Sequence, residues 1–280
     1  MRREDRAVLL VYALSWGLAL LYYLSGGRHP NAVPEPGMVK RFVLFSLAYM
    51  WTPGLVAILL AWREGRRLSV WGRPNVYWLY AWLLPLFFAA LAVLLSLPLG
   101  SFQGLAGIKA QLPPELQNVP DLSLVSLLAT QVLFAAATVN LVFALGEELF
   151  WRGYLFFLVE ARGFWPASLY IGVVLGLWHA PLILMGHNYP HHPFAGVLMM
   201  TAFTVMATPT LLWLRLKGES LIPPALFHGG LNAVGGLTVV VFKDANPLLV
   251  GLPGLGGLAA FALFNLWLRR EVPNATPGED

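Results

Sequence analysis

The chain has 280 residues, of which 58% are hydrophobic and 11% are charged. A water-soluble domain carries about 25% charged residues, so the composition argues against a globular domain and indicates a polytopic membrane protein. The sequence pI near 9.5 does not indicate nucleic-acid binding, because membrane proteins collect Lys and Arg in cytoplasmic loops. No cysteine is present, which excludes disulfides and cysteine-ligated metals.

Apolar stretches bounded by Gly, Pro or charge predict about eight transmembrane helices in a single all-α membrane domain spanning residues 1–280. Helices are expected because only helices and closed barrels satisfy the backbone in lipid. The first is interpreted as an uncleaved span, since no small-residue cleavage site follows it. The predicted helices are residues 7–25, 42–62, 77–97, 124–160, 166–185, 194–216, 221–241 and 248–268.

Two polar segments fall outside these helices. Residues 100–121, with LPPEL and NVPD turns, predict an extracytoplasmic loop in which a short interfacial helix could lie. Residues 271–280 predict a disordered tail. With the N-terminus inside, 13 of the 18 Lys and Arg residues fall in inner segments and 5 in outer ones, which predicts that both termini are cytoplasmic.

The predicted fourth helix contains GEELFWRG, with charges at Glu147, Glu148 and Arg152. A charge near the bilayer centre costs at least ~2.5–3.5 kcal/mol, so such residues are functional candidates. Glu148 and Arg152 share a helix face, which predicts a supporting ion pair, whereas Glu147 lies about 100° away and could face a cavity. The segment fits equally well a span that ends at Leu145 and a solvated cap that carries all three charges.

Two of the six histidines, His179 and His228, lie in predicted helices. They can meet Glu147 roughly 10–15 Å below the cytoplasmic face if the fourth span continues to about residue 156 and Arg152 extends to the surface. Asn232 lies four residues after His228 and shares its helix face. The other histidines fall in predicted loops and are interpreted as ordinary loop residues; adjacent His191 and His192 make only a weak metal site. These four are His29, His187, His191 and His192.

These side chains indicate hydrolysis. A carboxylate beside a neutral imidazole can orient and deprotonate a water for attack on an amide, and two aligned donors such as His228 and Asn232 can hold an oxyanion. No Ser–His–Asp set is evident, and the chain contains no H-E-x-x-H helix of the zinc-protease type.

The motifs E-E-x-x-x-R (from Glu147), an apolar residue four before His179 and H-x-x-x-N (from His228) occur in this order. Over roughly residues 124–237 the chain resembles the type II CAAX prenyl protease and bacteriocin-immunity family of intramembrane proteases, also called CPBP or ABI. At Leu175 the family usually carries Phe, a departure that affects packing more than chemistry.

The resemblance implies a helical bundle with a conical cavity open toward the cytoplasm and the lipid, and it assigns the catalytic core to residues 124–237. It implies that Glu147 activates the water, that His179 is its partner, and that His228 and Asn232 form the oxyanion site. Glu148 and Arg152 match the supporting pair. No cofactor is expected. Zinc at Glu147, His179 and His228 stays open, because the family has been described both as metalloproteases and as metal-independent glutamate proteases.

The favoured function is therefore an intramembrane endopeptidase that cuts a membrane-tethered peptide, with a prenylated CAAX protein as one candidate substrate. Membrane lipid is the other expected partner, and nucleic acid is not. The expected location is a prokaryotic plasma membrane with the site opening toward the cytoplasm. The alternatives are a non-proteolytic membrane scaffold or bacteriocin-immunity factor and, less favoured because no matching pair of broken helices is evident, a proton-coupled transporter.

Overall fold

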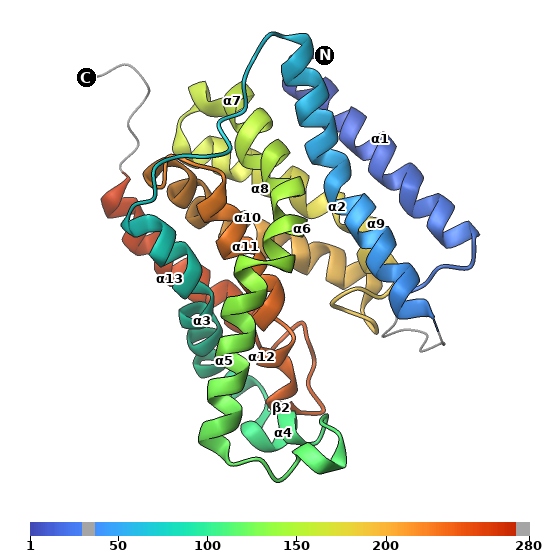
Figure 1. The fold of residues 1–280 in the computed structure, drawn as a ribbon, viewed down its shortest axis with the longest axis vertical. Coiled ribbons are helices and arrows are strands. Elements are labelled where there is room, and N and C mark those ends of the chain that lie inside the picture. Colours follow the sequence, from blue (N-terminus) through green and yellow to red (C-terminus); the bar gives the residue numbers. More distant parts are fainter. Residues whose placement is uncertain (30–36, 273–280) are drawn as a thin grey trace.

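A computed structural model describes residues 1–29 and 37–272, and nearly all of its regular structure is helical (Figure 1). The first three predicted spans are confirmed as α1 (Arg3–Leu24), α2 (Met38–Arg63) and α3 (Val76–Ser96). The predicted sixth is α10 (Pro193–Lys217). The predicted disordered tail lies, from residue 273 on, outside the described residues.

The predicted fourth helix is broken rather than continuous. It consists of α5 (Asp121–Ala137), α6 (Val139–Glu148), the π-helix η3 (Leu149–Leu155), α7 (Phe156–Val159) and the 3-10 turn η4 (Glu160–Arg162). The chain bends by 45° at Thr138, whose hydroxyl donates to the carbonyl of Phe134 at 2.6 Å. Helical structure nevertheless continues past Arg152, so the helix does not end at Leu145.

Two further predicted helices are interrupted. The fifth consists of α8 (Phe164–Trp178) and α9 (Ala180–Leu184), separated at His179. Pro181 lacks a backbone N–H and disfavours a continuous helix there. The seventh consists of α11 (Ile222–Val234) and α12 (Leu237–Val240), and the last, α13 (Leu255–Glu271), begins later than predicted.

The loop predicted for residues 100–121 contains short elements. They are β1 (Ser101–Phe102), α4 (Leu105–Lys109) and the 3-10 turn η2 (Pro114–Leu116), preceded by η1 (Leu97–Leu99). β1 pairs antiparallel with β2 (Phe242–Lys243), which joins this loop to the segment before α13. Together they cover the end of the molecule opposite to the start of α1 (Figure 1).

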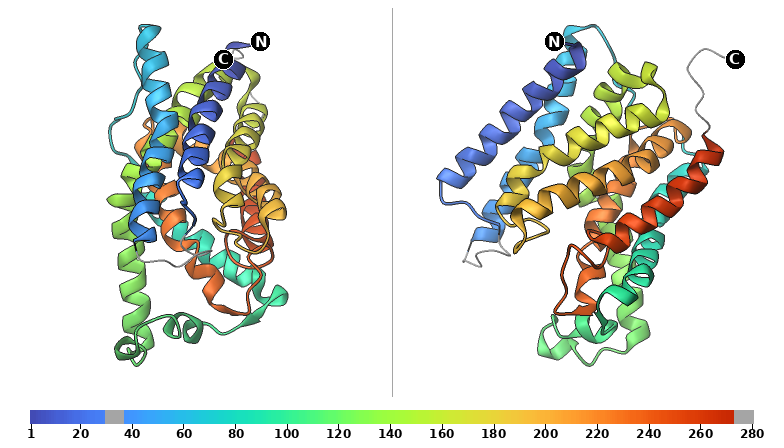
Figure 2. Two further views of the ribbon diagram at one scale, coloured as in Figure 1. Left: turned by 90° about the vertical axis from the view of Figure 1, so that its right-hand side faces the viewer. Right: turned by 180° about the vertical axis from the view of Figure 1, so that it is seen from behind.

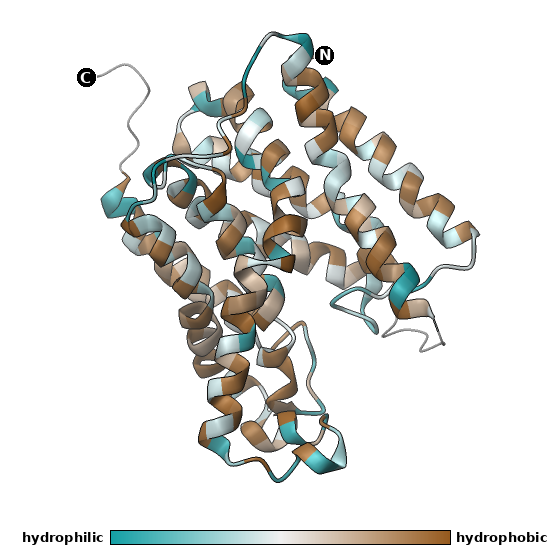
Figure 3. Cartoon of the chain, viewed as in Figure 1, coloured by the Kyte–Doolittle hydropathy of each residue, from teal (hydrophilic) through white to brown (hydrophobic). Residues whose placement is uncertain are grey.

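Among the described residues, five helices are long and apolar enough to cross a membrane, and a sixth is added if the bent pair over residues 121–162 is one span. α11 has 13 residues and α13 has 17, fewer than the ~20 that a span requires, so the predicted count of eight is not confirmed. In the view of Figure 3, apolar residues predominate along the helices, as expected for an integral membrane protein. The first turn of α1 and the last turn of α13 lie at the same end of the molecule (Figure 2). Which membrane side this end faces stays a prediction.

Glycines allow the site helices to approach their neighbours closely. A Cβ on Gly172 of α8 would lie 2.6 Å from the Cα of Val205 on α10. A Cβ on Gly146 of α6 would lie 2.7 Å from the carbonyl oxygen of Met50 on α2. Small residues at such contacts favour helix association in membranes, where the hydrophobic effect does not drive it. The second contact directly precedes Glu147 and therefore sets where that side chain lies.

Candidate active site

The three charges of GEELFWRG are buried: Glu147 is 1% exposed, Glu148 0% and Arg152 1%. The interpretation of these residues as a solvated cap is therefore wrong. The predicted ion pair is present, with Arg152 Nη1 2.9 Å from Glu148 Oε1. Arg152 does not extend to the surface as expected, because its Nη2 also donates to the hydroxyl of Thr208 on α10 at 3.2 Å. Both partners hold the guanidinium inside the bundle.

Glu148 also binds His228, a contact that was not predicted. His228 Nδ1 lies 2.9 Å from the same Oε1 that accepts from Arg152. Because a carboxylate oxygen accepts, Nδ1 carries a proton, and Nε2 is left to face a ligand. Nε2 is an acceptor in the neutral ring and a donor in the doubly protonated ring. Glu148 thus orients the histidine and balances its positive charge when it is protonated.

Glu147 makes neither of the bonds that hold Glu148 Oε1, although Oε2 of Glu148 also has no hydrogen-bond partner among the described residues. Oε2 of Glu147 is buried and has no hydrogen-bond partner among the described residues. The carboxylate lies within electrostatic range of His228, Glu148 and Arg152. Because Arg152 and His228 hold Glu148 but not Glu147, Glu147 is the carboxylate that we expect to act on a ligand or water.

His179 lies at the break between α8 and α9, and its ring is half-buried. Its Nδ1 lies 2.9 Å from the carbonyl oxygen of Leu175. That oxygen can only accept, so Nδ1 carries the proton and Nε2 of the neutral ring is an acceptor. His179 is within electrostatic range of His228 and Arg152. Within the described residues no hydrogen bond joins it to Glu147.

Asn232 lies one turn after His228 on α11 and is exposed, as a side chain that must reach a ligand would be. A second asparagine was missed: the Asn140 amide on α6 donates to the carbonyl of Gly229 at 2.9 Å. It ties the helix of Glu147 to the helix of His228. Asn140 lies seven residues before Glu147, two turns away on the same face, and this spacing could have identified it.

Two of the four histidines predicted to lie in loops, His29 and His187, form a pair. His29 Nε2 lies 3.2 Å from His187 Nδ1, and His29 is only 7% exposed. Burial and the charge of His29 lower the pKa of His187 to about 3. Burial also lowers the pKa of His29 below its ordinary value.

The described residues do not form an evident metal site, since no three His, Asp or Glu side chains among them are placed to hold one ion. His179 and His228 each use Nδ1 for a protein partner, which leaves one nitrogen on each ring. Metal-ligating histidines use their other ring nitrogen in the same way, so the zinc alternative at Glu147, His179 and His228 stays open. The expectation of no cofactor stays a prediction.

Residues 129–234 match the family model described as Type II CAAX prenyl endopeptidase Rce1-like. The chain is also 33% identical over 92 residues to "CAAX prenyl protease 2" of Methanococcus maripaludis. That alignment covers 31% of this chain and 34% of the relative, so the chain spans about a third of the length of the relative it matches. The range that the family model matches, residues 129–234, contains every residue of the candidate site.

Proposed function

We propose that this chain, which matches the type II CAAX prenyl endopeptidase family model over residues 129–234, is an intramembrane endopeptidase. One observation carries the proposal: of two adjacent buried carboxylates, Glu148 is held by Arg152 and His228, whereas Glu147 makes neither bond. On Glu148, Oε1 accepts from both Arg152 and His228, while Oε2 has no partner among the described residues. Two adjacent carboxylates thus have different environments, which is typical of a site where one performs chemistry and the other supports it.

In the proposed reaction, Glu147 takes a proton from a water molecule, and the hydroxide attacks the carbonyl carbon of the scissile peptide bond. Nε2 of His179 is the second acceptor that orients this water. The resulting oxyanion accepts from the Asn232 amide and from Nε2–H of a doubly protonated His228, whose charge Glu148 balances. The C–N bond then breaks, and Glu147 returns the proton to the leaving nitrogen.

The substrate class in this proposal is a peptide held at the membrane by a lipid, such as a prenylated C-a-a-X terminus. Two findings support it: the name of the Methanococcus relative, and the position of Glu147 and His179 in segments that have the length and composition of membrane spans. A substrate whose anchor lies in the bilayer reaches such a site without leaving the lipid.

The experiment is cleavage of a farnesylated C-a-a-X peptide by purified protein in lipid nanodiscs. We expect Glu147→Ala to lower the rate by about 10²–10⁴-fold, the range for loss of a general base. Glu160→Ala is the matched control, because it removes an exposed carboxylate from η4 of the same broken helix. An unlipidated peptide of the same sequence tests the substrate class.

Undiminished cleavage by Glu147→Ala would refute the mechanism. Equal rates for the lipidated and unlipidated peptides would refute the substrate class but not the peptidase. Absence of cleavage by the wild type, together with full biological activity of Glu147→Gln, would favour the scaffold or immunity alternative.

A further inference from the structure

The helix break before His179 exposes a backbone carbonyl that two distant side chains bind. α8 ends at Trp178 and α9 begins at Ala180, and no backbone hydrogen bond across the break reaches the Trp178 carbonyl within the described residues. Instead the Tyr49 hydroxyl of α2 donates to it at 2.7 Å, and the Trp16 indole of α1 donates at 3.2 Å. A buried carbonyl in lipid requires such partners.

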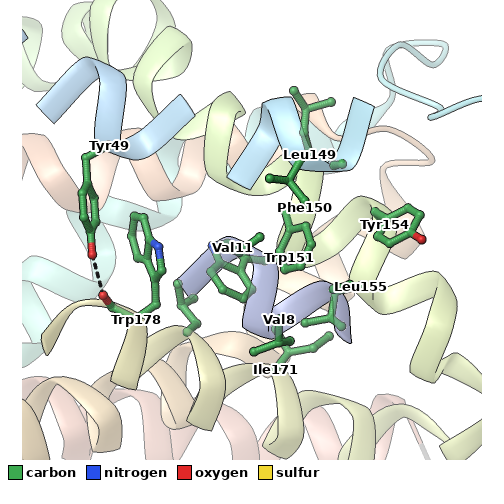
Figure 4. Packing of buried hydrophobic residues seen from close by; sticks show 14 of the residues in the cluster. Val8, Val11, Tyr49, Leu149, Phe150, Trp151, Tyr154, Leu155, Ile171 and Trp178 are labelled. Carbon is green, nitrogen blue, oxygen red and sulfur yellow. Dashed lines mark hydrogen bonds between the residues drawn. The ribbon is translucent and has the colours of Figure 1, made fainter. Parts of the chain in front are cut away.

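Tyr49 binds the carbonyl that directly precedes His179 and lies within electrostatic range of Glu147. It is 0% exposed, and its ring packs against that of Trp178 with centroids 4.4 Å apart (Figure 4). Its hydroxyl is within electrostatic range of the Glu147 carboxylate. The close approach of α2 and α6 at Gly54 and Gly146, next to Glu147, brings Tyr49 to this position.

We propose that Tyr49 is a positioning residue that fixes His179 relative to Glu147 through its hydrogen bond to the Trp178 carbonyl. The inference deepens the proposed function and rests on it. The peptide group that Tyr49 holds joins Trp178 to His179, so the bond sets where the backbone of His179 lies. The bond from His179 Nδ1 to Leu175 then sets the ring orientation. With both hydrogen bonds in place, Nε2 of His179 points in one direction. Loss of the Tyr49 bond allows the backbone between α8 and α9 to move.

The test compares Tyr49→Phe with Tyr12→Phe in the peptide-cleavage assay. The Tyr12 hydroxyl of α1 donates to the carbonyl of Val174 at 2.5 Å, one turn before Trp178 on the same helix. The two variants therefore each remove one hydroxyl bound to α8, but only Tyr49→Phe releases the break. We expect Tyr49→Phe to lower kcat about ten- to a hundredfold with KM within about twofold, as for a small misplacement of a catalytic group. Tyr12→Phe should leave both constants within about twofold of wild type.

A second measurement does not depend on peptidase activity. In protein labelled with ¹⁵N-histidine, the ring signals of His179 should shift in Tyr49→Phe and stay unchanged in Tyr12→Phe. If the wild type cleaves no peptide, the proposed function fails while this measurement still decides the positioning role. Unchanged His179 signals in Tyr49→Phe, equal effects of both variants on kcat, or an effect on KM alone would overturn the inference.

Trp16→Phe covers the case in which Tyr49→Phe does not fold. It removes the other donor to the same carbonyl from a side chain that is 40% exposed. We expect a fall in kcat of about two- to fivefold, in keeping with the longer bond, and a smaller shift of the same His179 signals. No change in either readout would count against the role of the Trp178 carbonyl.

Discussion

The buried Glu148–Arg152 pair allows a quantitative test of whether these charges are held inside the protein. We would measure the free energy of unfolding of Arg152→Met, Glu148→Gln and the double variant. Met preserves the length of the Arg stem, and Gln preserves the shape of Glu, so each change removes mainly charge. The exposed pair of Lys109 with Asp121, at 2.6 Å, is the control, tested as Lys109→Met.

The structure sets the expected magnitudes. Both side chains of the buried pair are 0% exposed, so removing one partner leaves the other as an uncompensated buried charge, which costs about 3–5 kcal/mol. In the double variant neither charge remains, so we expect it to cost less than the sum of the two single changes by about 2–3 kcal/mol. Part of the destabilisation should remain in the double variant, because His228 still contacts the side chain at position 148. The control should cost about 0–1 kcal/mol, since the Asp121 side chain is 70% exposed.

The assay is reversible unfolding in mixed detergent micelles, followed by helical circular dichroism. Costs for the single variants no larger than that of Lys109→Met would refute the reasoning, because they would mean that water reaches Glu148 and Arg152. Additive costs in the double variant would show that the two charges do not interact. Activity is measured in parallel, because loss of Glu148 should also misorient His228.

Three further predictions follow from other parts of the structure. Gly146→Ala should destabilise the protein by about 1–3 kcal/mol, since the new Cβ would meet backbone atoms of α2. Gly17→Ala, with open space around its Cβ, should be neutral or stabilising. Equal effects of the two substitutions would contradict this. Because the pKa of His187 is lowered to about 3 and that of His29 is also lowered, both stay neutral in the folded state near pH 6.5 while the unfolded chain takes up protons. The free energy of unfolding should therefore be highest above about pH 6.5 and fall by at most ~1.4 kcal/mol per pH unit per histidine as the pH drops toward 3. The fall should be shallower in His187→Asn. A flat profile between pH 7 and 5 would refute this prediction. Peptide cleavage should survive exhaustive dialysis against a strong chelator, and a loss of activity that added Zn²⁺ restores would show metal dependence.

Much of the helical architecture could be predicted, because long apolar runs have few alternatives in lipid. α1, α2, α3 and α10 begin and end within a few residues of the predicted bounds. The breaks at Thr138 and His179 were not predicted. An apolar run contains no local signal for a break whose freed carbonyls are bound by side chains from other helices, as Tyr49 and Trp16 bind Trp178.

The sequence by itself determined the membrane class, the family resemblance and the pairing of Glu148 with Arg152, since residues four apart on a helix meet whatever surrounds them. It could not decide whether Glu147 is solvated, because burial depends on how closely α2 approaches α6 at Gly146. Nor could it place His228 against Glu148, 80 residues away in the chain. Local periodicity determines which side chains share a face. Only the packing of one helix against another decides which faces meet, and here that packing distinguishes the two adjacent glutamates.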